Sequence, residues 1–358
     1  MGSYENNLEC AIILAAGLSS RTRPTTDNTP KPLLRILDKT LLEHNLEQLQ
    51  GIVDNVIIVI GFMGDTIKKR IGNRYGSIDI TYVEQKEQHG TGHALTQCNF
   101  TGRVLILMGD DLYSRKDMLN LIKYPSSVLV SHGYFDRFDM IYRKFNSLHS
   151  IEKSNSSDSG EVNTGCYVVD SDILNLGYYS NLLPDLINMY SAKKEVRVVK
   201  VVDYWIPVTY WWNYLQANQF MLKKRGEAIY VHETANVLKS ANLRKGSIIF
   251  DNVTVGGEVV DSVIMENTKA KHNCYIGHSV IGRNCNIGAG TITSDYRHDG
   301  KEHNVRMNAK VVKSRRKKLG ACLGDNVNTG INTSIYPGRR IFSNMTTLPG
   351  EIVKEDKL

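Results

Sequence analysis

Apolar residues recur at every sixth position through the last third of the chain. The repeat starts at Val231, Val237, Leu243, Ile249 and Val255 and continues, with slips of register, at Ile264, Ala270, Ile276, Ile281, Ile287, Thr329, Ile335 and Ile341. A period of six matches neither the 3.6-residue helix nor the two-residue strand, and it is the repeat of a parallel β-helix with short flat faces. Several of these apolar residues are followed by glycine, as a tight corner requires. The sequence therefore predicts a parallel β-helix over residues 226–358.

The first 225 residues instead alternate short apolar runs with stretches of helical pattern. Strands are expected at residues 11–14, 55–60, 80–84, 103–108, 127–131 and 166–169, and helices at 41–50 and 63–70. Continuous Val, Ile and Leu strands separated by helices indicate a mostly parallel sheet covered on both faces. We therefore expect a Rossmann-like α/β domain over residues 1–225, with ligands at the carboxyl ends of its strands.

The stretch LAAGLSSRTRPTTDNTPKPLL, residues 14–34, follows the first predicted strand. Backbone amides in a turn of Leu14, Ala15, Ala16 and Gly17 and the serines after it can surround phosphate oxygens, and two basic residues, Arg21 and Lys31, add positive charge. This layout is typical of a nucleoside triphosphate clamp, and it fits neither the Walker loop nor the GxGxxG fingerprint. An ordinary strand-to-helix turn with exposed charges is the simpler alternative.

Three further stretches carry candidate ligand contacts. In VEQKEQHGTGHAL, residues 83–95, Gln85 could read a base edge, while Gly90 and Thr91 belong to a small-residue turn that permits close approach. In LILMGDDLY, residues 105–113, Asp110 and its neighbour Asp111 end an apolar strand, which suits Mg²⁺, although such a pair is often a helix cap or a solvated turn. Around a polar loop, Glu152 and Asn163 could bind sugar hydroxyls; a turn cap before Gly165 is the alternative for Asn163.

Bulk composition limits the partners and the compartment. The net charge of +7 over 358 residues is modest, so small anionic ligands explain it as well as nucleic acid does. The chain has no apolar run of membrane-spanning length, and MGSYENNLEC at its start resembles neither a signal peptide nor, with Asn6, a myristoylation site. The six scattered cysteines contain no CxxC pair and are expected to be buried thiols. We expect a cytoplasmic protein that binds neither membranes nor nucleic acid.

The motifs of the N-terminal part resemble those of sugar-1-phosphate nucleotidylyltransferases. Their order, followed by the hexapeptide repeat, is similar to the fused N-acetylglucosamine-1-phosphate uridylyltransferase and glucosamine-1-phosphate acetyltransferase family, particularly its archaeal members. The resemblance is most specific at residues 14–34, 85–94, 161–165 and 286–301. It implies that a sugar-1-phosphate attacks the α-phosphorus of UTP or dTTP with Mg²⁺ as cofactor. It also implies that the β-helix is left-handed.

The resemblance assigns roles in this first reaction residue by residue. Arg21 would hold the outgoing phosphates, Lys31 the reacting phosphates, Gln85 and Gly90 the base, Asp110 the metal, and Glu152 and Asn163 the sugar. The reaction needs in-line positioning and charge neutralisation but no general base, because the attacking phosphate is already ionised.

Two positions depart from the family pattern. Pro207 stands where the family commonly has the acid that supplies a second metal contact, and Asp203, four residues earlier, is a candidate substitute. Asp139 lies near a usual glycine and could repel an anionic sugar phosphate. Two alternatives therefore stay open: an acetyltransferase whose nucleotidylyl site has lost turnover, and a nucleotide-sugar-sensing regulatory subunit that is not catalytic.

The resemblance also assigns an acetyltransferase site to the β-helix. His272 lies where these enzymes place the base that deprotonates the amine, whereas a solitary histidine without that context is more often a solvated loop residue. Expected sugar-phosphate contacts are Tyr275, Asn286, Asp295, Tyr296 and Lys301, with Asp295 replacing a common Asn, and expected acetyl-CoA contacts are Ala289, Gly330 and Asn332.

A basic run interrupts the repeat between residues 297 and 318. It fits a solvated face and a loop that attracts polyanionic acetyl-CoA equally well. Left-handed hexapeptide helices generally trimerise with acetyl-CoA sites between neighbours, so the resemblance implies a homotrimer.

Overall fold

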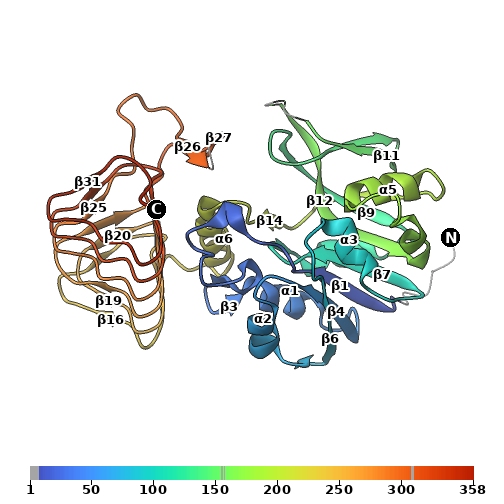
Figure 1. Ribbon diagram of the computed structural model, residues 1–358, viewed down its shortest axis with the longest axis horizontal. Helices are drawn as coiled ribbons and strands as arrows, with labels where there is room; N and C mark the ends of the chain where they lie inside the picture. The colour runs from blue at the N-terminus through green and yellow to red at the C-terminus, as the bar shows by residue number, and fades with distance from the viewer. Residues whose placement is uncertain (1–7, 155, 157, 308–309) are drawn as a thin grey trace. The chain divides into compact units, whose positions relative to one another are not determined.

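A computed structural model describes residues 8–154, 156, 158–307 and 310–358 (Figure 1). These described residues form two compact units: unit 1 takes those within 8–18, 30–33 and 41–207, and unit 2 those within 19–29, 34–40 and 208–358. The boundary expected at residue 225 comes from the repeat and stays a prediction, because unit 2 also takes in residues 208–225 and two N-terminal segments. The expectation about an N-terminal signal rests largely on residues 1–7, which lie outside the described residues.

Unit 1 is built on a ten-stranded sheet in the order β10-β11-β13-β9-β12-β7-β1-β4-β6-β5. In that order the strands are Met140–Lys144, Ser147–Glu152, Arg197–Lys200, Ser127–Tyr134, Ser159–Asp170, Arg103–Met108, Cys10–Leu14, Asn55–Ile60, Ile78–Glu84 and Arg74–Tyr75. The central strands β7, β1, β4 and β6 are parallel, whereas β12 runs antiparallel between β7 and β9. All six predicted strands are present, but the sheet is mixed rather than mostly parallel.

Helices cover both faces of this sheet, as the alternation of buried residues along β1 requires. Ile12 belongs to one core with residues of α3 and α5, and Ala11 and Ile13 belong to a second core with residues of α1, α2 and α4. These helices are α1 Leu41–Leu49, α2 Gly64–Ile71, α3 Thr91–Thr96, α4 Arg115–Leu121 and α5 Leu183–Ser191. Figure 1 shows α1 and α2 on the opposite side of the sheet from α3 and α5. The predicted Rossmann-like α/β domain is confirmed.

The C-terminal part of unit 2 is the predicted left-handed parallel β-helix, with three strand columns. One face consists of β15 Tyr230–Val231, β18 Ile248–Ile249, β21 Val263–Ile264, β24 Val280–Ile281, β28 Cys322–Leu323 and β30 Arg340–Ile341. A second consists of β17 Asn242–Leu243, β20 Glu258–Val260, β23 Tyr275–Gly277, β25 Ile292–Thr293, β29 Ser334–Ile335 and β31 Ile352–Val353. The third consists of β16 Asn236–Val237, β19 Thr254–Val255 and β22 Lys269–Ala270, continued by single bridges through Asn286, Asn328 and Thr346.

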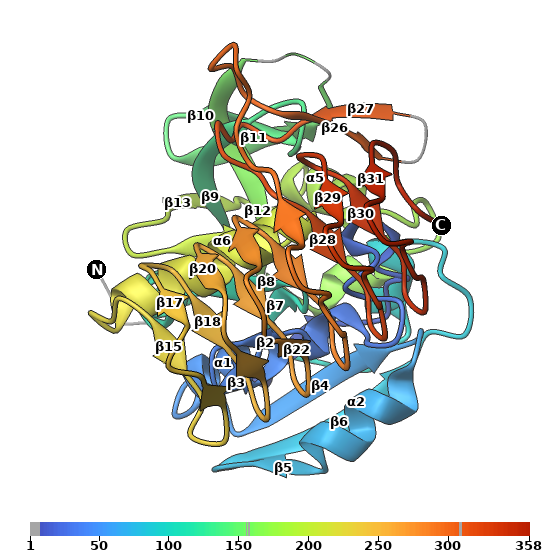
Figure 2. The same cartoon turned by 90° about the vertical axis from the view of Figure 1, so that its left-hand side faces the viewer.

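The six-residue repeat forms the core of these coils. Ile249, Val255 and Ile264 are fully buried, as are most later members of the repeat. Val231, Val237 and Leu243 are less buried, the first two with 36% and 41% of their surface exposed, because they belong to the first coil of the stack. Figure 2 shows the stacked coils and, leaving them, a hairpin of β26 Asn304–Met307 and β27 Lys310–Lys313. This hairpin lies in the predicted basic interruption, of which residues 308–309 lie outside the described residues.

Two N-terminal segments pack in unit 2 with the β-helix and with α6, Trp211–Lys224. Arg35, in the β2–β3 hairpin of Arg35–Ile36 and Lys39–Thr40, forms ion pairs with Asp251 and Glu266. In the loop that carries the predicted clamp, Asp27 accepts a hydrogen bond of 2.9 Å from the Ser343 hydroxyl. Asn28 Nδ2 donates to Asp325 Oδ2 over 3.3 Å. The clamp loop is therefore held by the last coils of the β-helix.

Two expectations from composition can be compared with the structure. All six cysteines are buried free thiols, as expected. No helix in the described part of the chain has the length and apolar character needed to cross a lipid bilayer.

Asparagines occupy one corner of successive coils. Asn252, Asn267, Asn284, Asn326 and Asn344 all have a left-handed backbone, with φ between 54° and 67°. Each of the first four donates its side-chain amide to the side-chain oxygen of the next, over 2.9–3.3 Å. Asparagine suits this corner because it tolerates positive φ and can bond to its copy in the next coil. These residues form an asparagine ladder.

The asparagine ladder gives a stability prediction. We expect Asn326→Ala to lower the free energy of unfolding by about 2 kcal/mol, since it removes two side-chain hydrogen bonds and leaves in the left-handed position a residue without the polar side chain that helps asparagine to tolerate it. Asn326→Gly is the matched control, because it keeps the backbone freedom and should cost only about 1 kcal/mol. Urea unfolding followed by circular dichroism measures both. Equal losses in the two variants would contradict the backbone contribution.

Candidate active sites

The first candidate site lies at the carboxyl end of β1 in unit 1. The turn begins at Leu14, and Leu14, Ala15 and Ala16 are buried. The Ala15 amide donates to Val59 of β4, and the Leu14 carbonyl accepts from Gly109 after β7, so the turn is tied to both neighbouring strands. Packing does not require a glycine at Gly17, because a Cβ there would meet no atom within 4 Å.

The loop after this turn, Ser19–Thr29, belongs to unit 2. Ser19 has a left-handed backbone with φ 57°. Its carbonyl accepts from the hydroxyls of Thr22 and Thr26, over 3.0 and 2.9 Å, which fixes the shape of the loop. Arg21 is exposed and forms no ion pair with any residue in the described ranges. Its guanidinium is thus available to an anion.

Lys31 and Asp110 form an ion pair within unit 1. The Lys31 Nζ lies 2.5 Å from Asp110 Oδ2, and Lys31 is only 5% exposed, whereas the Asp110 side chain is 39% exposed. The structure thus brings together the residues predicted to bind phosphate and metal. Asp111 has a different place, because it is buried and accepts from the Trp205 indole over 2.9 Å. Of this acidic pair, Asp110 is the more accessible carboxylate.

The strand pairing argues against Asp203 as the substitute for the missing acid, which stays a prediction. In the β8–β14 ladder, Asp111–Tyr113 with Trp205–Pro207, Pro207 faces Asp111 and Trp205 faces Tyr113. Asp203 therefore lies beyond the far end of the ladder, five residue steps or about 16 Å from the level of Asp110. Its backbone amide instead donates to Asp117. A residue count could not reveal this, because antiparallel pairing reverses the direction of β14.

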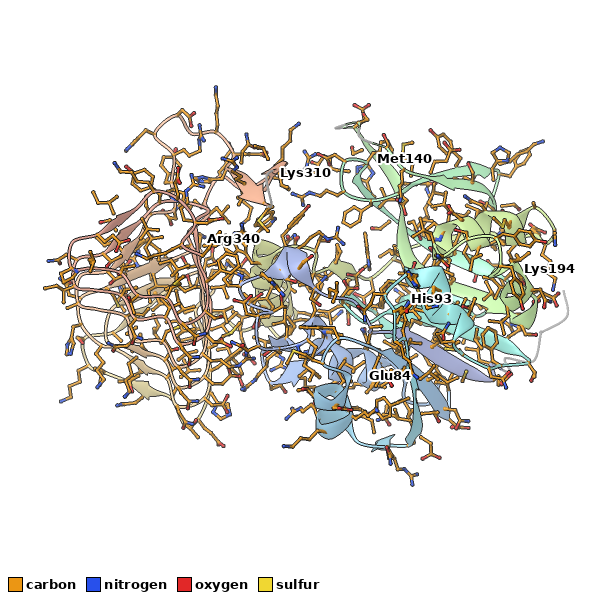
Figure 3. The ribbon with its side chains drawn as sticks, in the orientation of Figure 1. Glu84, His93, Met140, Lys194, Lys310 and Arg340 are labelled. Carbon is orange, nitrogen blue, oxygen red and sulfur yellow. The ribbon has the colours of Figure 1, made fainter. Side chains whose placement is uncertain are left out.

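Gln85 is buried at the end of β6 with its amide held in one orientation. Its Nε2 donates to the Gly90 carbonyl over 3.0 Å and lies 2.9 Å from Nδ1 of His93. A carbonyl only accepts, so the nitrogen must face Gly90, and both of its hydrogens are used. The remaining oxygen, Oε1, is the group that Gln85 offers to a ligand. Figure 3 labels His93 on α3 and Glu84, the residue before Gln85.

The small residues that open α3 serve chain packing. The Gly92 and His93 amides donate to the Asn181 carbonyl, and Thr91 Oγ1 accepts from the Leu183 amide over 3.1 Å. Gly90 has φ 121°, and a Cβ on it would lie 2.6 Å from the Asn181 carbonyl oxygen. The close approach expected of a ligand is thus made here by Asn181, and the Thr91 hydroxyl binds the chain.

Glu152 and Asn163 lie on two strands that each pair with β10, near Met140, which is labelled in Figure 3. Met140 pairs with Glu152 of β11 and, on its other side, with Val162 of β12. Asn163 is not at the end of a loop, as expected, but within β12. Its side chain donates to the Tyr167 hydroxyl over 2.6 Å and accepts from the Gly165 amide over 3.0 Å. The last contact supports the alternative that Asn163 caps a turn.

Asp139 lies beside this pair. Its backbone carbonyl accepts from the Asn163 amide over 2.9 Å. Burial raises the pKa of the Asp139 carboxyl, an effect that Asp185 reinforces and the nearby Lys153 opposes. A raised pKa reduces the charge that Asp139 carries at mildly acidic pH.

The second candidate site is a groove in unit 2 along the corner between two faces of the β-helix. It has a volume of about 570 Å³ and is lined by Tyr275, Ile292, Gly290 and Asn332 among others. The structure therefore brings together a residue expected to bind sugar phosphate, Tyr275, and one expected to bind acetyl-CoA, Asn332. His272 precedes Asn273 and Cys274 of the lining; its side chain is exposed and forms no hydrogen bond or ion pair with any residue in the described ranges.

Several other expected residues of this site have structural roles or lie apart from the groove lining. Asn332 has a left-handed backbone, φ 56°, and its backbone amide donates to the Ala289 carbonyl over 2.7 Å. Both residues therefore help to form a corner of the coil. Gly330 is packed so closely that a Cβ would lie 2.5 Å from the Leu348 backbone. Asn286 is exposed on the third face, and Tyr296 and Lys301 are exposed at the start of the basic interruption.

Asp295 contacts His278, a histidine for which the sequence predicts no role. The Tyr275 hydroxyl donates to Asp295 Oδ2 over 3.2 Å, and Nε2 of His278 lies 3.3 Å from the same oxygen. A signal was present in the sequence, since His278 follows Gly277 at a coil corner two residues before the next apolar pair. Only the structure shows that the next coil brings Asp295 against it.

Two family models match the chain. Nucleotidyl transferase matches residues 10–127, and the GMPPB C-terminal domain matches residues 226–315. A curated relative, the bifunctional protein GlmU of Methanocaldococcus jannaschii, is 32% identical over 93% of this chain and 92% of its own length. The chain belongs to the family of bifunctional GlmU proteins. The expected resemblance is confirmed.

Other relatives of the GlmU family agree. The bifunctional protein GlmU of Methanococcus vannielii is 30% identical over 93% of this chain and 92% of its own. The bifunctional sugar-1-phosphate nucleotidylyltransferase/acetyltransferase of Sulfurisphaera tokodaii is 30% identical over 97% of each chain. A solved Bacillus anthracis structure, described as a glucose-1-phosphate thymidylyltransferase, superposes with a TM-score of 0.53 over 59% of this chain and 94% of its own. At 23% identity, that likeness supports the fold alone.

The pairing of β8 with β14 gives a prediction about the binding of divalent cations. We expect Asp110→Asn to weaken Mn²⁺ binding in the presence of a nucleoside triphosphate by about tenfold or more, because it removes the accessible carboxylate beside Lys31. Asp203→Asn is the matched control and should leave binding unchanged, since its carboxylate lies at the other end of the ladder. Electron paramagnetic resonance of free Mn²⁺ measures both. An equal loss in the Asp203 variant would show that Asp203 reaches the metal.

Proposed function

We propose that this bifunctional transferase makes a nucleotide sugar in two steps. In unit 2, acetyl-CoA acetylates the amine of an amino-sugar-1-phosphate of the glucosamine-1-phosphate class. In unit 1, a sugar-1-phosphate reacts with UTP or dTTP to give a nucleotide sugar and pyrophosphate. The observation that carries the proposal is the chemical content of the two sites: a buried lysine with an accessible carboxylate in one, and a groove beside an exposed histidine in the other.

In the nucleotidylyl reaction, an oxygen of the sugar phosphate attacks the α-phosphorus and the bond to the β-phosphate oxygen breaks. Lys31, held in a buried position, neutralises negative charge on the reacting phosphates, and Arg21 holds the outgoing pyrophosphate. Asp110 is a hard oxygen ligand of the kind that Mg²⁺ takes from proteins, and bound Mg²⁺ would supply further charge neutralisation on the phosphates. Lys31 then moves from the Asp110 carboxylate to phosphate.

The amide orientation of Gln85 supports a uracil or thymine base. Both hydrogens of Nε2 are bound within the protein, so the only group that Gln85 can offer a base is the acceptor Oε1. Uracil and thymine carry a ring N–H donor, whereas cytosine carries an acceptor at that position. The pairing therefore favours UTP or dTTP over CTP.

In the acetyl transfer, the amine attacks the thioester carbonyl and His272 takes the proton that the amine loses. The thiolate of coenzyme A leaves and is protonated. Tyr275, on the groove, and Asp295, bonded to it, face the acceptor, while Asn286, Tyr296 and Lys301 bind its phosphate. Asn332 with Ala289 and Gly330 lines the acetyl-CoA path.

We also propose a cytoplasmic homotrimer. The His272 side chain is exposed and has no hydrogen bond or ion pair with the residues that the structure describes, which suits a site completed by a neighbouring copy. The basic interruption with its hairpin offers a neighbour positive charge for acetyl-CoA.

The function is tested by assaying both reactions on the full chain. We expect His272→Ala to lower kcat for acetylation of glucosamine-1-phosphate by about 10²–10⁴-fold, because it removes the base. Pyrophosphate release from UTP and N-acetylglucosamine-1-phosphate should be unchanged and serves as the folding control. Unaltered acetylation would show that another group is the base. Wild-type protein that binds UTP tightly without releasing pyrophosphate would favour the sensing alternative.

The base contact gives a second prediction. His93→Leu removes one of two acceptors that orient Gln85, so we expect the KM for UTP to rise about fivefold and the preference for UTP over CTP to fall by a similar factor. His93→Asn keeps an acceptor near the position of Nδ1 and should restore most of the preference. Steady-state pyrophosphate assays with each nucleotide measure both ratios. A loss of rate that is equal for UTP and CTP would indicate a general structural defect instead.

A further inference from the structure

His278 is a buried histidine of the β-helix for which the proposed reactions have no use. It stands at a coil corner with a left-handed backbone, φ 50°, and its side chain is 7% exposed. Its ring lies between two carboxylates: Nδ1 is 3.4 Å from Asp261 Oδ2, and Nε2 is 3.3 Å from Asp295 Oδ2. The two aspartates belong to the coil before and the coil after it.

The contacts of Asp295 connect His278 to the acetylation groove. The Tyr275 hydroxyl donates to the same oxygen, Oδ2, that faces His278. Tyr275 in turn lines the groove with Asn332. The pKa of Tyr275 is raised to about 12 by burial and by the Asp295 charge, so its hydroxyl stays a donor to Asp295 at neutral pH. Asp261, Asp295, Tyr275 and His278 form one cluster, the His278 cluster.

A neutral imidazole cannot satisfy both carboxylates. It carries one N–H, so one ring nitrogen faces a carboxylate with a lone pair. In agreement, buried Nδ1 of His278 has no hydrogen-bond partner in the described part of the chain. Both N···O distances also exceed those of short charge-assisted hydrogen bonds. Protonation of the ring would provide donors to both carboxylates.

Opposing groups set the charge of the ring. Burial lowers the pKa of His278, as do the positive charges of Arg316 and Lys318, while Asp261 and Asp295 raise it, with a net result below the ordinary value of 6.5. His303 also lies nearby, with Nε2 3.1 Å from the Asp295 backbone carbonyl, and burial lowers its pKa too. A pKa below the ordinary value favours the neutral ring at neutral pH, so the imidazole does not offset the charge of the carboxylates beside it.

We propose that His278 is a positioning residue for acetyl transfer, which holds Asp295 and Tyr275 at the groove and sets the negative charge that the acceptor amine meets. The inference rests on the proposed acetylation and deepens it, because it names the recognised group: a cationic amine beside hydroxyls. Asp295, where related enzymes commonly have Asn, makes this group anionic. Among the described side chains, only Tyr275 and His278 make a polar contact with its carboxylate.

The proposal fixes the direction of a pH effect. As the pH falls through the lowered pKa of His278, the ring gains a proton, and its positive charge offsets part of the negative charge of the carboxylates beside it. Binding of a cationic acceptor weakens, so its KM rises. The base His272 acts in the chemical step and affects kcat, which separates the two histidines.

His278→Asn is the decisive variant. Asparagine tolerates the left-handed corner and keeps an amide donor, but it does not titrate. The KM and kcat for glucosamine-1-phosphate are measured at saturating acetyl-CoA between pH 5.5 and 8.5, with pyrophosphate release from UTP as the folding control. At pH 8 we expect a rise in KM of about fivefold with kcat within about twofold, as expected for one misplaced polar contact. The extra rise in KM of the wild type at low pH should disappear.

A double-mutant cycle with Asp295→Asn tests whether His278 acts through Asp295. If it does, the double variant should have the KM of Asp295→Asn alone rather than the product of the two effects. A wild-type KM and pH profile in His278→Asn, or fully multiplicative effects in the cycle, would overturn the assignment while the proposed function stands. Absence of acetylation in the wild type, with any amino-sugar phosphate, would instead overturn the proposed function and this inference with it.

Discussion

The left-handed corner is the constraint on which the β-helix depends. Each coil must turn three times within about eighteen residues, and several of these turns place a residue at positive φ, where most side chains are strained. Glycine and asparagine meet the constraint, as in the asparagine ladder and at Asn332. Because corners stack above one another, any polar group at a corner meets the corner of the next coil. The geometry that allows the coil to turn therefore also creates columns of interacting polar groups.

The His278 cluster is one of these columns of stacked polar groups. His278 occupies a corner position at φ 50°, and the stack places Asp261 on one side of it and Asp295 on the other. In unit 1 the groups meet at the carboxyl end of the parallel strands, where β1 and its neighbours bring Lys31 and Asp110 into contact. In both units the reactive groups lie where regular backbone ends, because only there do side chains from separate segments converge.

Sequence patterns were sufficient for the architecture and for some of the site. The six-residue period identified the buried residues of the coils because each faces inward once per face, and the motif order identified the family. Register and pairing were beyond reach. The antiparallel pairing of β14 with β8 argues against Asp203 as a partner of Asp110, and β12 includes Asn163, which looked like a loop residue. Local patterns also could not show that Gly90 and Thr91 contact Asn181 and Leu183 of the same chain and not a ligand. His278 was missed because its two partners are seventeen residues away in either direction, a spacing that becomes contact only after coiling.

The loop from Ser19 to Thr29 has a consequence for how this chain can be divided. Its residues Asp27 and Asn28 bond to Ser343 and Asp325, and Arg35 after it pairs with Asp251. A fragment that ends near residue 225 would keep the clamp motif but lose all three partners, so motif boundaries are poor guides to independent modules here. Gene fusion in such a protein is not simply the joining of two self-sufficient parts. An N-terminal loop is part of the scaffold that the β-helix completes, and exchange of either half between relatives would have to carry these contacts with it.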